Sequence, residues 1–120
     1  MRTGGCVYIL ANRRNGALYT GVTSDLRARI AQHRAGSTPG FATRYGIKRL
    51  VWYEPHWGVE AAIVRETQIK RWNRSWKIEM IEKTNPDWYD LAVKELGFDP
   101  IARSTASPLA SGDGFPLSRE

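Results

Sequence analysis

The chain has 120 residues, of which 42% are hydrophobic and 11% aromatic, so it has enough apolar material for one ordinary domain but not for two. No apolar run approaches the roughly 20 residues that a membrane-spanning helix needs, so we expect no membrane helix, and we expect no secretory signal either. The single cysteine excludes an internal disulfide framework and a cysteine-based zinc cluster, which favours a cytoplasmic location.

The positive charge is concentrated in the first two thirds of the chain. The formal net charge is +6 at pH 7. Residues 1–80 hold fourteen basic and five acidic side chains, whereas residues 81–120 hold four basic and seven acidic ones. Such a positive region favours a polyanionic partner, most simply nucleic acid, and the alternative is a solvated basic surface.

The first elements expected are two β-strands joined by a tight turn. Residues 7–11 are apolar and β-rich, and residues 17–22 have the composition of a return strand. Asn15-Gly16 between them is a strong hairpin signal. Gly21 indicates a point where the backbone passes close to another group.

A regular two-residue turn at this place predicts the register of the two strands. Tyr8 then faces Thr23, and Tyr19 faces Asn12, so the tyrosines are not directly opposed. Both can still lie on one face of the sheet. Strand tyrosines of this kind are commonly core or rim residues, and that is the alternative to a chemical role.

The remaining elements give the order β-β-α-β-α-α-α, which predicts an α+β fold with a small three-stranded antiparallel sheet flanked by helices. Helix boundaries are indicated by capping residues and glycines. The predicted elements are a helix over 26–34 ended by Gly36, a loop over 36–46, a strand over 47–53, and helices over 59–71, over 76–82 with Ser75 as its cap, and over 88–96.

Three polar side chains fall close to predicted apolar faces. Arg29 and His33 are one turn apart on the first helix and flank Ile30, so Arg29 either binds an anion or lies on the helix flank with its head in water. Glu66 occupies an apolar position of the predicted helix over 59–71. It needs either a divalent cation such as Mg²⁺ or an ion pair with an arginine of the first helix.

Other classes of site are disfavoured. The sequence has no phosphate-binding glycine loop, no zinc-protease motif and no paired cysteines. Cys6 lies at the edge of an apolar strand, where a buried and inert thiol is expected. Trp72 and Trp76 share a stripe whose spacing fits core packing better than stacking on bases.

These segments resemble the GIY-YIG nuclease family. Cys6-Val7-Tyr8 is similar to the first signature, with Cys6 in place of its glycine, and Tyr19-Thr20-Gly21 is similar to the second, with Arg29 ten residues after Tyr19. Residues 65–70 resemble the metal-binding glutamate motif. Residues 85–91 look like the ending of small stand-alone bacterial members related to the excinuclease nuclease domain.

The resemblance covers about residues 4–96 and implies a domain organisation. We expect the nuclease domain over 4–84, a helical extension over 85–98 and a disordered tail over 99–120, where proline, serine and glycine dominate. Val22 stands where excinuclease-type members carry a lysine.

The resemblance also implies a metal-dependent endonuclease that hydrolyses DNA phosphodiester bonds at a single-metal site. It implies that one Mg²⁺ or Mn²⁺ ion binds, and that no small-molecule cofactor is needed. By this resemblance, Tyr8 would contact the attacking water, Tyr19 the scissile phosphate and Arg29 a phosphate oxygen. Glu66 would bind the metal ion. His33 would support the first tyrosine, and Asn85 would have a supporting role.

Basic residues are expected to hold DNA without strong sequence preference, because the sequence contains no recognition helix or zinc module. An inactive nucleic-acid-binding module and a module that binds an acidic protein are the alternatives. The candidate DNA contacts are Arg13, Arg14, Arg27, Arg34, Arg44, Lys48, Arg49, Lys70, Arg71, Arg74 and Lys77.

Overall fold

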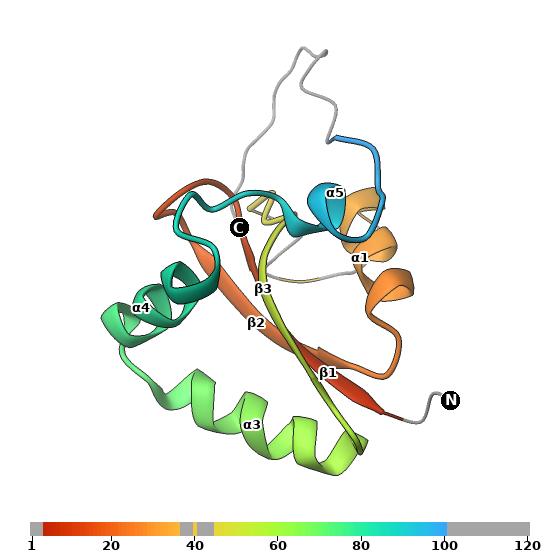
Figure 1. Cartoon of the computed structure of the whole chain (residues 1–120), viewed down its shortest axis with the longest axis vertical. Coiled ribbons are helices and arrows are strands. Elements are labelled where there is room, and N and C mark those ends of the chain that lie inside the picture. Colours follow the sequence, from red (N-terminus) through yellow and green to blue (C-terminus); the bar gives the residue numbers. More distant parts are fainter. Residues whose placement is uncertain (1–3, 37–39, 41–44, 101–120) are drawn as a thin grey trace.

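The computed structural model describes residues 4–36, 40 and 45–100 (Figure 1). Its order of elements confirms the predicted α+β fold. Arg44 and nearly all of the predicted tail lie outside the described residues. The elements are β1 (Gly5–Ala11), β2 (Leu18–Thr23), α1 (Leu26–Ala35), β3 (Arg49–His56), α3 (Val59–Arg71), α4 (Arg74–Thr84) and α5 (Leu91–Lys94).

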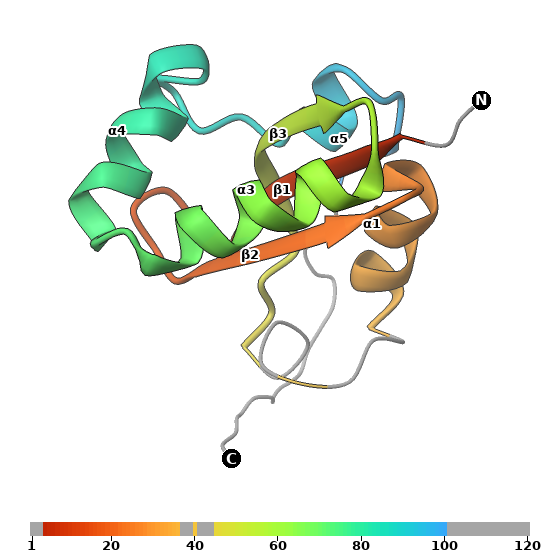
Figure 2. The same cartoon turned by 90° about the horizontal axis from the view of Figure 1, so that it is seen from below.

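The three strands form one antiparallel sheet in the order β2-β1-β3. Helices α3 and α4 cover one face of it, and α1 and α5 cover the other (Figures 1 and 2). The central strand β1 is therefore enclosed on both sides, which explains why all seven of its residues are buried. This places the tyrosine of β1 beneath α1.

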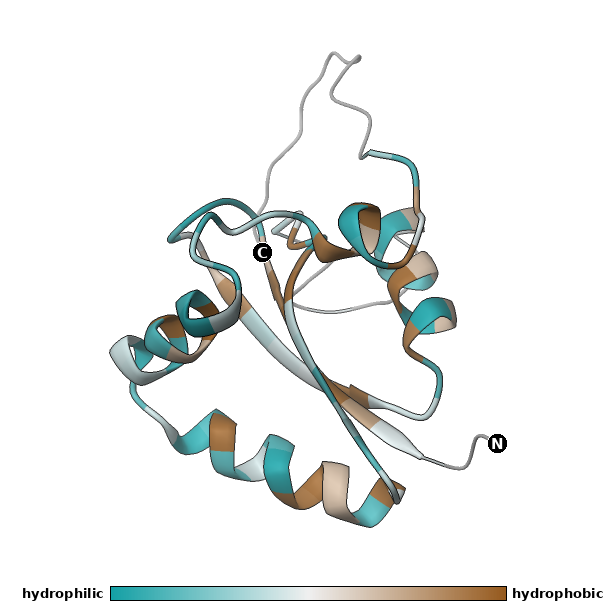
Figure 3. Cartoon of the chain, in the orientation of Figure 1, coloured by the Kyte–Doolittle hydropathy of each residue, from teal (hydrophilic) through white to brown (hydrophobic). Residues whose placement is uncertain are grey.

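Each face of the sheet has its own hydrophobic cluster. Val7 and Ile9 point toward α3 and α4 and pack with Trp88, which is fully buried. Tyr8 and Leu10 point the other way, where the second cluster includes α1 and α5. In Figure 3, α1 and α3 carry apolar and hydrophilic residues in alternation along the ribbon, as expected for helices that cover one face of a sheet.

The predicted hairpin register is wrong by two residues. Tyr8 faces Gly21 and Tyr19 faces Leu10. The connection is longer than a two-residue turn because the Asn12 side chain accepts a hydrogen bond from the Ala17 amide at 2.9 Å and closes the loop early. Directly opposed residues and their second neighbours share a face, so Tyr8 and Tyr19 still lie on the same side of the sheet.

Side-chain caps set the helix boundaries. Asp25 accepts a hydrogen bond from the Ala28 amide at the start of α1. α4 begins before the predicted position because Asn73, and not Ser75, accepts from the Trp76 amide at 2.9 Å. The last helix is shorter than predicted, since Asp90 caps it by accepting from the Ala92 amide.

The apolar faces of α3 and α4 are narrower than the sequence suggests. Ala62 and Ile69 are buried, but Val59 and Ile63, which the sequence pattern places on the same face, are exposed. The stripe that Trp76 shares with Trp72 predicts a core position for Trp76, but 55% of this residue is exposed. The residues after α4 contribute Trp88 and Leu91 to the two clusters, so this extension packs against the sheet.

Within the described ranges, no helix combines the length and the apolar character that a crossing of the bilayer requires.

Candidate active site

Three aromatic rings from three elements meet on the α1 side of the sheet. The ring centroids of Tyr8 and Tyr19 are 6.3 Å apart, those of Tyr8 and His33 are 5.8 Å apart, and those of Tyr19 and His33 are 5.5 Å apart. The three rings therefore form a nearly equilateral triangle, which we call the aromatic triangle. It joins β1, β2 and the second half of α1.

Gly21 makes room for this triangle. A Cβ atom at position 21 would lie 2.5 Å from both Cζ and the hydroxyl oxygen of Tyr8, which faces it across the β1–β2 pair. Any side chain there would collide with the phenol. The close approach that the sequence predicted at Gly21 is thus to the Tyr8 ring.

Tyr8 and His33 form a buried hydrogen-bonded pair. The Tyr8 hydroxyl lies 3.0 Å from Nε2 of His33, and each residue is only 1% exposed. Burial is the main reason that the pKa of Tyr8 is raised well above its ordinary value and that the pKa of His33 is lowered. Both groups are therefore neutral at pH 7.

Arg29 lies at the edge of the triangle, one turn of α1 before His33. Its positive charge lowers the pKa of Tyr8 and of His33. Among the described residues, none forms a hydrogen bond or an ion pair with this guanidinium. A half-buried arginine without a partner favours an anion, and its fork suits the oxygens of a phosphate.

Glu66 lies on α3, the helix that covers the other face of the sheet. Only 12% of its side chain is exposed, and its charge contributes to the raised pKa of Tyr8. One carboxylate oxygen lies 2.7 Å from Nζ of Lys70, one turn further along α3. The predicted alternative, an ion pair with an arginine of the first helix, is wrong, because the partner comes from the same helix.

The carboxylate of Glu66 fits a metal ion that keeps most of its water. The described part of the chain contains no group of three or more histidine, cysteine or acidic side chains that could hold a metal. A closed zinc site therefore does not fit these residues. A single hard oxygen ligand suits Mg²⁺ or Mn²⁺, whose remaining ligands are water and substrate oxygens.

Asn85 lies in a structural network. It is buried, its amide donates to the carbonyls of Val51 at 3.1 Å and Tyr89 at 3.0 Å, and its oxygen accepts from the Tyr89 amide. None of these contacts within the described chain involves the aromatic triangle. The geometry accordingly assigns Asn85 to the anchoring of the segment that follows α4.

Two of the candidate DNA-binding arginines are engaged by the C-terminal segment. Arg34 forms an ion pair with Asp90 at 3.2 Å, and both side chains are largely buried. Arg27 donates to the Leu96 carbonyl and Arg34 to the Asp99 carbonyl, and both guanidinium groups lie over the Phe98 ring. These contacts hold the residues around Phe98 against α1.

Other candidate cations differ in their surroundings. Arg49 donates to the Trp88 carbonyl, and Arg74 donates to the carbonyls of Asn15 and Gly16 in the hairpin loop. Arg13, Arg14, Lys70 and Arg71 are exposed, and Lys48 and Lys77 are half-buried.

Cys6 is the buried and inert thiol that the sequence predicts. It donates a weak hydrogen bond to the Val7 carbonyl at 3.6 Å. Burial raises its pKa to about 11, so the nucleophilic thiolate is scarce at neutral pH.

Comparison with known proteins gives the family. The model of the GIY-YIG catalytic domain matches residues 4–79, which include the aromatic triangle, Arg29 and Glu66. The chain belongs to the GIY-YIG family. This finding supports a nuclease family for the fold and site described above.

Relatives of this GIY-YIG chain are small stand-alone proteins. A UPF0213 protein of Staphylococcus haemolyticus is 38% identical over 77 residues, which span 64% of this chain and 93% of the relative. One from Streptococcus sanguinis is 32% identical over 69 residues, spanning 58% and 79%. The solution NMR structure of a UPF0213 protein from Bacillus halodurans shares 27% identity with a TM-score of 0.48, over 77% of this chain and 97% of that one.

One feature of this GIY-YIG site was missed by the sequence reasoning. Lys70 was assigned only to DNA binding, although its ammonium group occupies the position beside Glu66 where a cation is expected. The spacing of four residues on a helix was a sufficient signal for the pairing.

Proposed function

We propose that this GIY-YIG protein is a divalent-metal-dependent endonuclease that hydrolyses phosphodiester bonds in DNA. The observation that carries the proposal is the buried Tyr8–His33 pair together with Arg29 one turn before His33 on α1, whose guanidinium forms no hydrogen bond or ion pair among the described residues. Phosphodiester hydrolysis needs a positioned nucleophile and stabilisation of the negative charge that develops on the phosphate oxygens. Arg29 supports the second requirement.

The different burial of the two tyrosines supports different roles. Tyr8 is buried and hydrogen-bonded to His33, so it acts as a positioning residue that holds the rings of the aromatic triangle in place. Tyr19 is half-exposed and contacts both other rings, so its hydroxyl is the better candidate to reach the attacking water or the scissile phosphate. His33 orients Tyr8 and packs against Tyr19.

Glu66 is the residue that would hold the metal ion. When bound, a divalent ion supplies positive charge at the phosphate and lowers the pKa of a coordinated water. The Lys70 ammonium group neutralises the carboxylate, and because 55% of its side chain is exposed it can move aside at small cost.

Exposed cations on the hairpin loop and at the end of α3 favour DNA as the partner. Arg13 and Arg14 lie in the hairpin loop, and Lys70 and Arg71 lie at the end of α3. Contacts of this kind go mainly to the phosphate backbone, so binding depends on salt more than on base sequence.

The test is cleavage of a panel of labelled single-stranded, duplex and flapped DNA substrates in Mg²⁺ or Mn²⁺. Glu66→Gln and Arg29→Ala should each reduce cleavage by at least about 100-fold, which corresponds to about 2.7 kcal/mol of transition-state stabilisation. Glu60→Gln, an exposed carboxylate on the same helix, is the control and should cleave normally. Cleavage that survives both site substitutions would reject the proposed site.

A second candidate function is favoured by the Glu66–Lys70 ion pair, which already neutralises the carboxylate. In that case the protein is an inactive nucleic-acid-binding module. It would bind DNA with an affinity that falls as salt rises, and it would cleave none of the substrates with either metal.

A further inference from the structure

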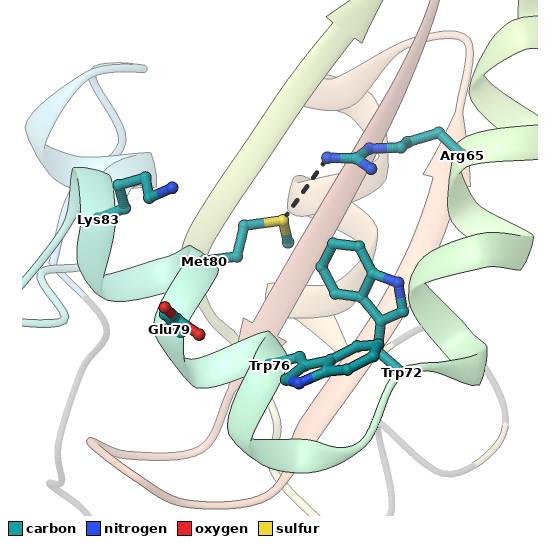
Figure 4. Close-up of a pocket in the computed structure, with 6 residues that line it drawn as sticks. All are labelled: Arg65, Trp72, Trp76, Glu79, Met80 and Lys83. Atoms are coloured by element: carbon teal, nitrogen blue, oxygen red, sulfur yellow. Dashed lines mark hydrogen bonds between the residues drawn. The ribbon is translucent and has the colours of Figure 1, made fainter.

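An open groove lies between α3 and α4, on the other face of the sheet from the aromatic triangle (Figure 4). It has a volume of about 400 Å³. We call it the tryptophan groove, and it is lined by Arg65, Trp72, Trp76, Glu79, Met80 and Lys83.

Its two indole rings are exposed to different degrees. Trp72 is packed, because the Arg65 guanidinium lies over its ring at 5.3 Å and the ring contributes to the first hydrophobic cluster. Trp76 meets Trp72 edge to face, with ring centroids 6.1 Å apart, and leaves 55% of its own surface exposed. The sequence spacing predicted a core residue here, so Trp76 is an exposed aromatic platform that packing does not explain.

The charges beside the platform favour a polyanion. Four basic residues, Lys70, Arg71, Arg74 and Lys77, alternate with the two tryptophans in the segment 70–77, and Lys83 lies at the far end of the groove. Arg65 is compensated by Glu54 at 3.0 Å and Lys70 by Glu66 at 2.7 Å, whereas Arg74 donates hydrogen bonds only to neutral carbonyls and keeps its charge. Glu79 is the one acidic residue in the groove lining.

Aromatic rings next to cations are the combination that binds single-stranded nucleic acid, since bases stack on the rings while the cations attract phosphates. In a duplex the faces of the bases are already covered by their neighbours. We therefore propose that the tryptophan groove binds an unpaired base of the DNA strand, with Trp76 as the stacking platform. This proposal rests on the proposed function, because it specifies the class of DNA that the nuclease takes.

The groove lies close enough to Glu66 to act on the same strand. Trp72 follows Glu66 by six residues and caps the end of α3, so at 1.5 Å per residue the two lie roughly 9 Å apart along the helix axis. Neighbouring nucleotides of one strand can span such a separation. A strand that passes over the exposed Lys70 and Arg71 at the end of α3 would join the two sites. Substrates with an unpaired segment a few nucleotides from the cut, such as flaps and overhangs, are thus favoured.

The experiment compares Trp76→Ala with Trp57→Ala. Trp57 is 97% exposed and lies outside the groove, so it is a matched control for the loss of a surface indole. Binding of fluorescein-labelled oligothymidine and of a duplex of equal length is measured by anisotropy in EDTA, so that the result does not depend on cleavage. Trp76→Ala should weaken oligothymidine binding about tenfold, in line with the loss of one stacked base, and leave duplex binding unchanged. Trp57→Ala should leave both unchanged.

A conservative variant separates stacking from folding. Trp76→Phe keeps an aromatic platform and should restore most of the oligothymidine affinity. An equal loss for single-stranded and duplex DNA, no loss in Trp76→Ala, or the same loss in Trp57→Ala would each overturn the proposal.

The two proposals fail separately. Selective loss of single-strand binding in a protein that cleaves nothing with either metal would support the groove and reject the nuclease. Cleavage that depends on Glu66 but is unaffected by Trp76→Ala, together with unchanged single-strand binding, would support the nuclease and reject the groove.

Discussion

The hydroxyl group of Tyr8 and Nε2 of His33 are 3.0 Å apart in the interior of the protein. Nδ1 of the same imidazole has no hydrogen-bond partner within the described part of the chain. Protonation would bury a positive charge on a ring that has only one hydrogen-bonded nitrogen, and this cost agrees with the lowered pKa of His33. The Tyr8–His33 pair is thus neutral at pH 7, and the charges of Arg29 and Glu66 act on the pKa of Tyr8.

The first prediction concerns acid stability. The pKa of His33 is below its ordinary value of 6.5 in the folded protein, so below about pH 6.5 the unfolded chain binds a proton that the native state does not. The stability contributed by neutral His33 is complete above that pH and is lost as pH falls toward the lowered pKa. Urea unfolding at pH 7.5 and 5.5 should therefore show a smaller decline for His33→Asn than for the parent protein.

The other histidine must be removed from this comparison. His56 lies 2.8 Å from Glu54 and is the second of the two histidines, so His56→Asn is introduced into both proteins. An equal decline between the two pH values in the presence and absence of His33 would contradict the prediction.

The second prediction concerns Gly21. Gly21→Ala places a methyl group 2.5 Å from the Tyr8 ring and should destabilise the fold by about 1–3 kcal/mol, the usual cost of overpacking a core. The double variant with Tyr8→Leu removes the colliding ring atoms, so the two changes should not be additive. The measurement is a double-mutant cycle of unfolding free energies, and simple additivity would show that the contact with Tyr8 is not the cause.

The third prediction concerns the competition between Lys70 and a metal ion for Glu66. Lys70→Ala frees the carboxylate, and because an ion pair of this spacing is worth about 0.5 kcal/mol, Mn²⁺ should bind at least about twofold more tightly. Arg71→Ala removes a neighbouring exposed charge without touching Glu66 and is the control. Calorimetric titration with Mn²⁺ decides the matter, and equal affinities in the two variants would place the ion away from Glu66.

The fourth prediction separates Asn85 from catalysis. Asn85→Ala removes three buried hydrogen bonds and leaves carbonyl groups unpaired, so it should lower the free energy of unfolding by about 2–3 kcal/mol. Cleavage per folded molecule, measured well below the unfolding temperature, should remain within about twofold of the parent, which is less than about 0.5 kcal/mol of activation energy. A loss of cleavage comparable to that of Arg29→Ala would return Asn85 to the active site.

Local patterns were sufficient for the elements of the fold. The spacing of Arg29 and His33 on one helix face, and of Glu66 on a face that the pattern makes otherwise apolar, marked these side chains as candidates because helix geometry fixes which residues are neighbours. The hairpin register was not predictable from Asn15-Gly16 alone. It depends on the Asn12 side chain, which closes the loop two residues earlier than the turn signal suggests.

Contacts between distant segments were beyond the reach of sequence patterns. From the sequence, Arg27 and Arg34 are candidate DNA-binding cations. In the structure both guanidinium groups lie over Phe98, and Arg34 forms an ion pair with Asp90. Likewise, whether Trp76 is covered depends on where α4 lies relative to α3, and a spacing of four residues between tryptophans does not determine that.

The residues after α4 determine how the protein should be shortened for laboratory work. A fragment cut at the end of the family match would lack Trp88 and Leu91, one from each hydrophobic cluster. It would also uncover two guanidinium groups, those of Arg27 and Arg34, by removing Phe98. Such a fragment would fold poorly and would bind nucleic acids non-specifically. A binding assay should therefore use a version that extends at least through Asp99.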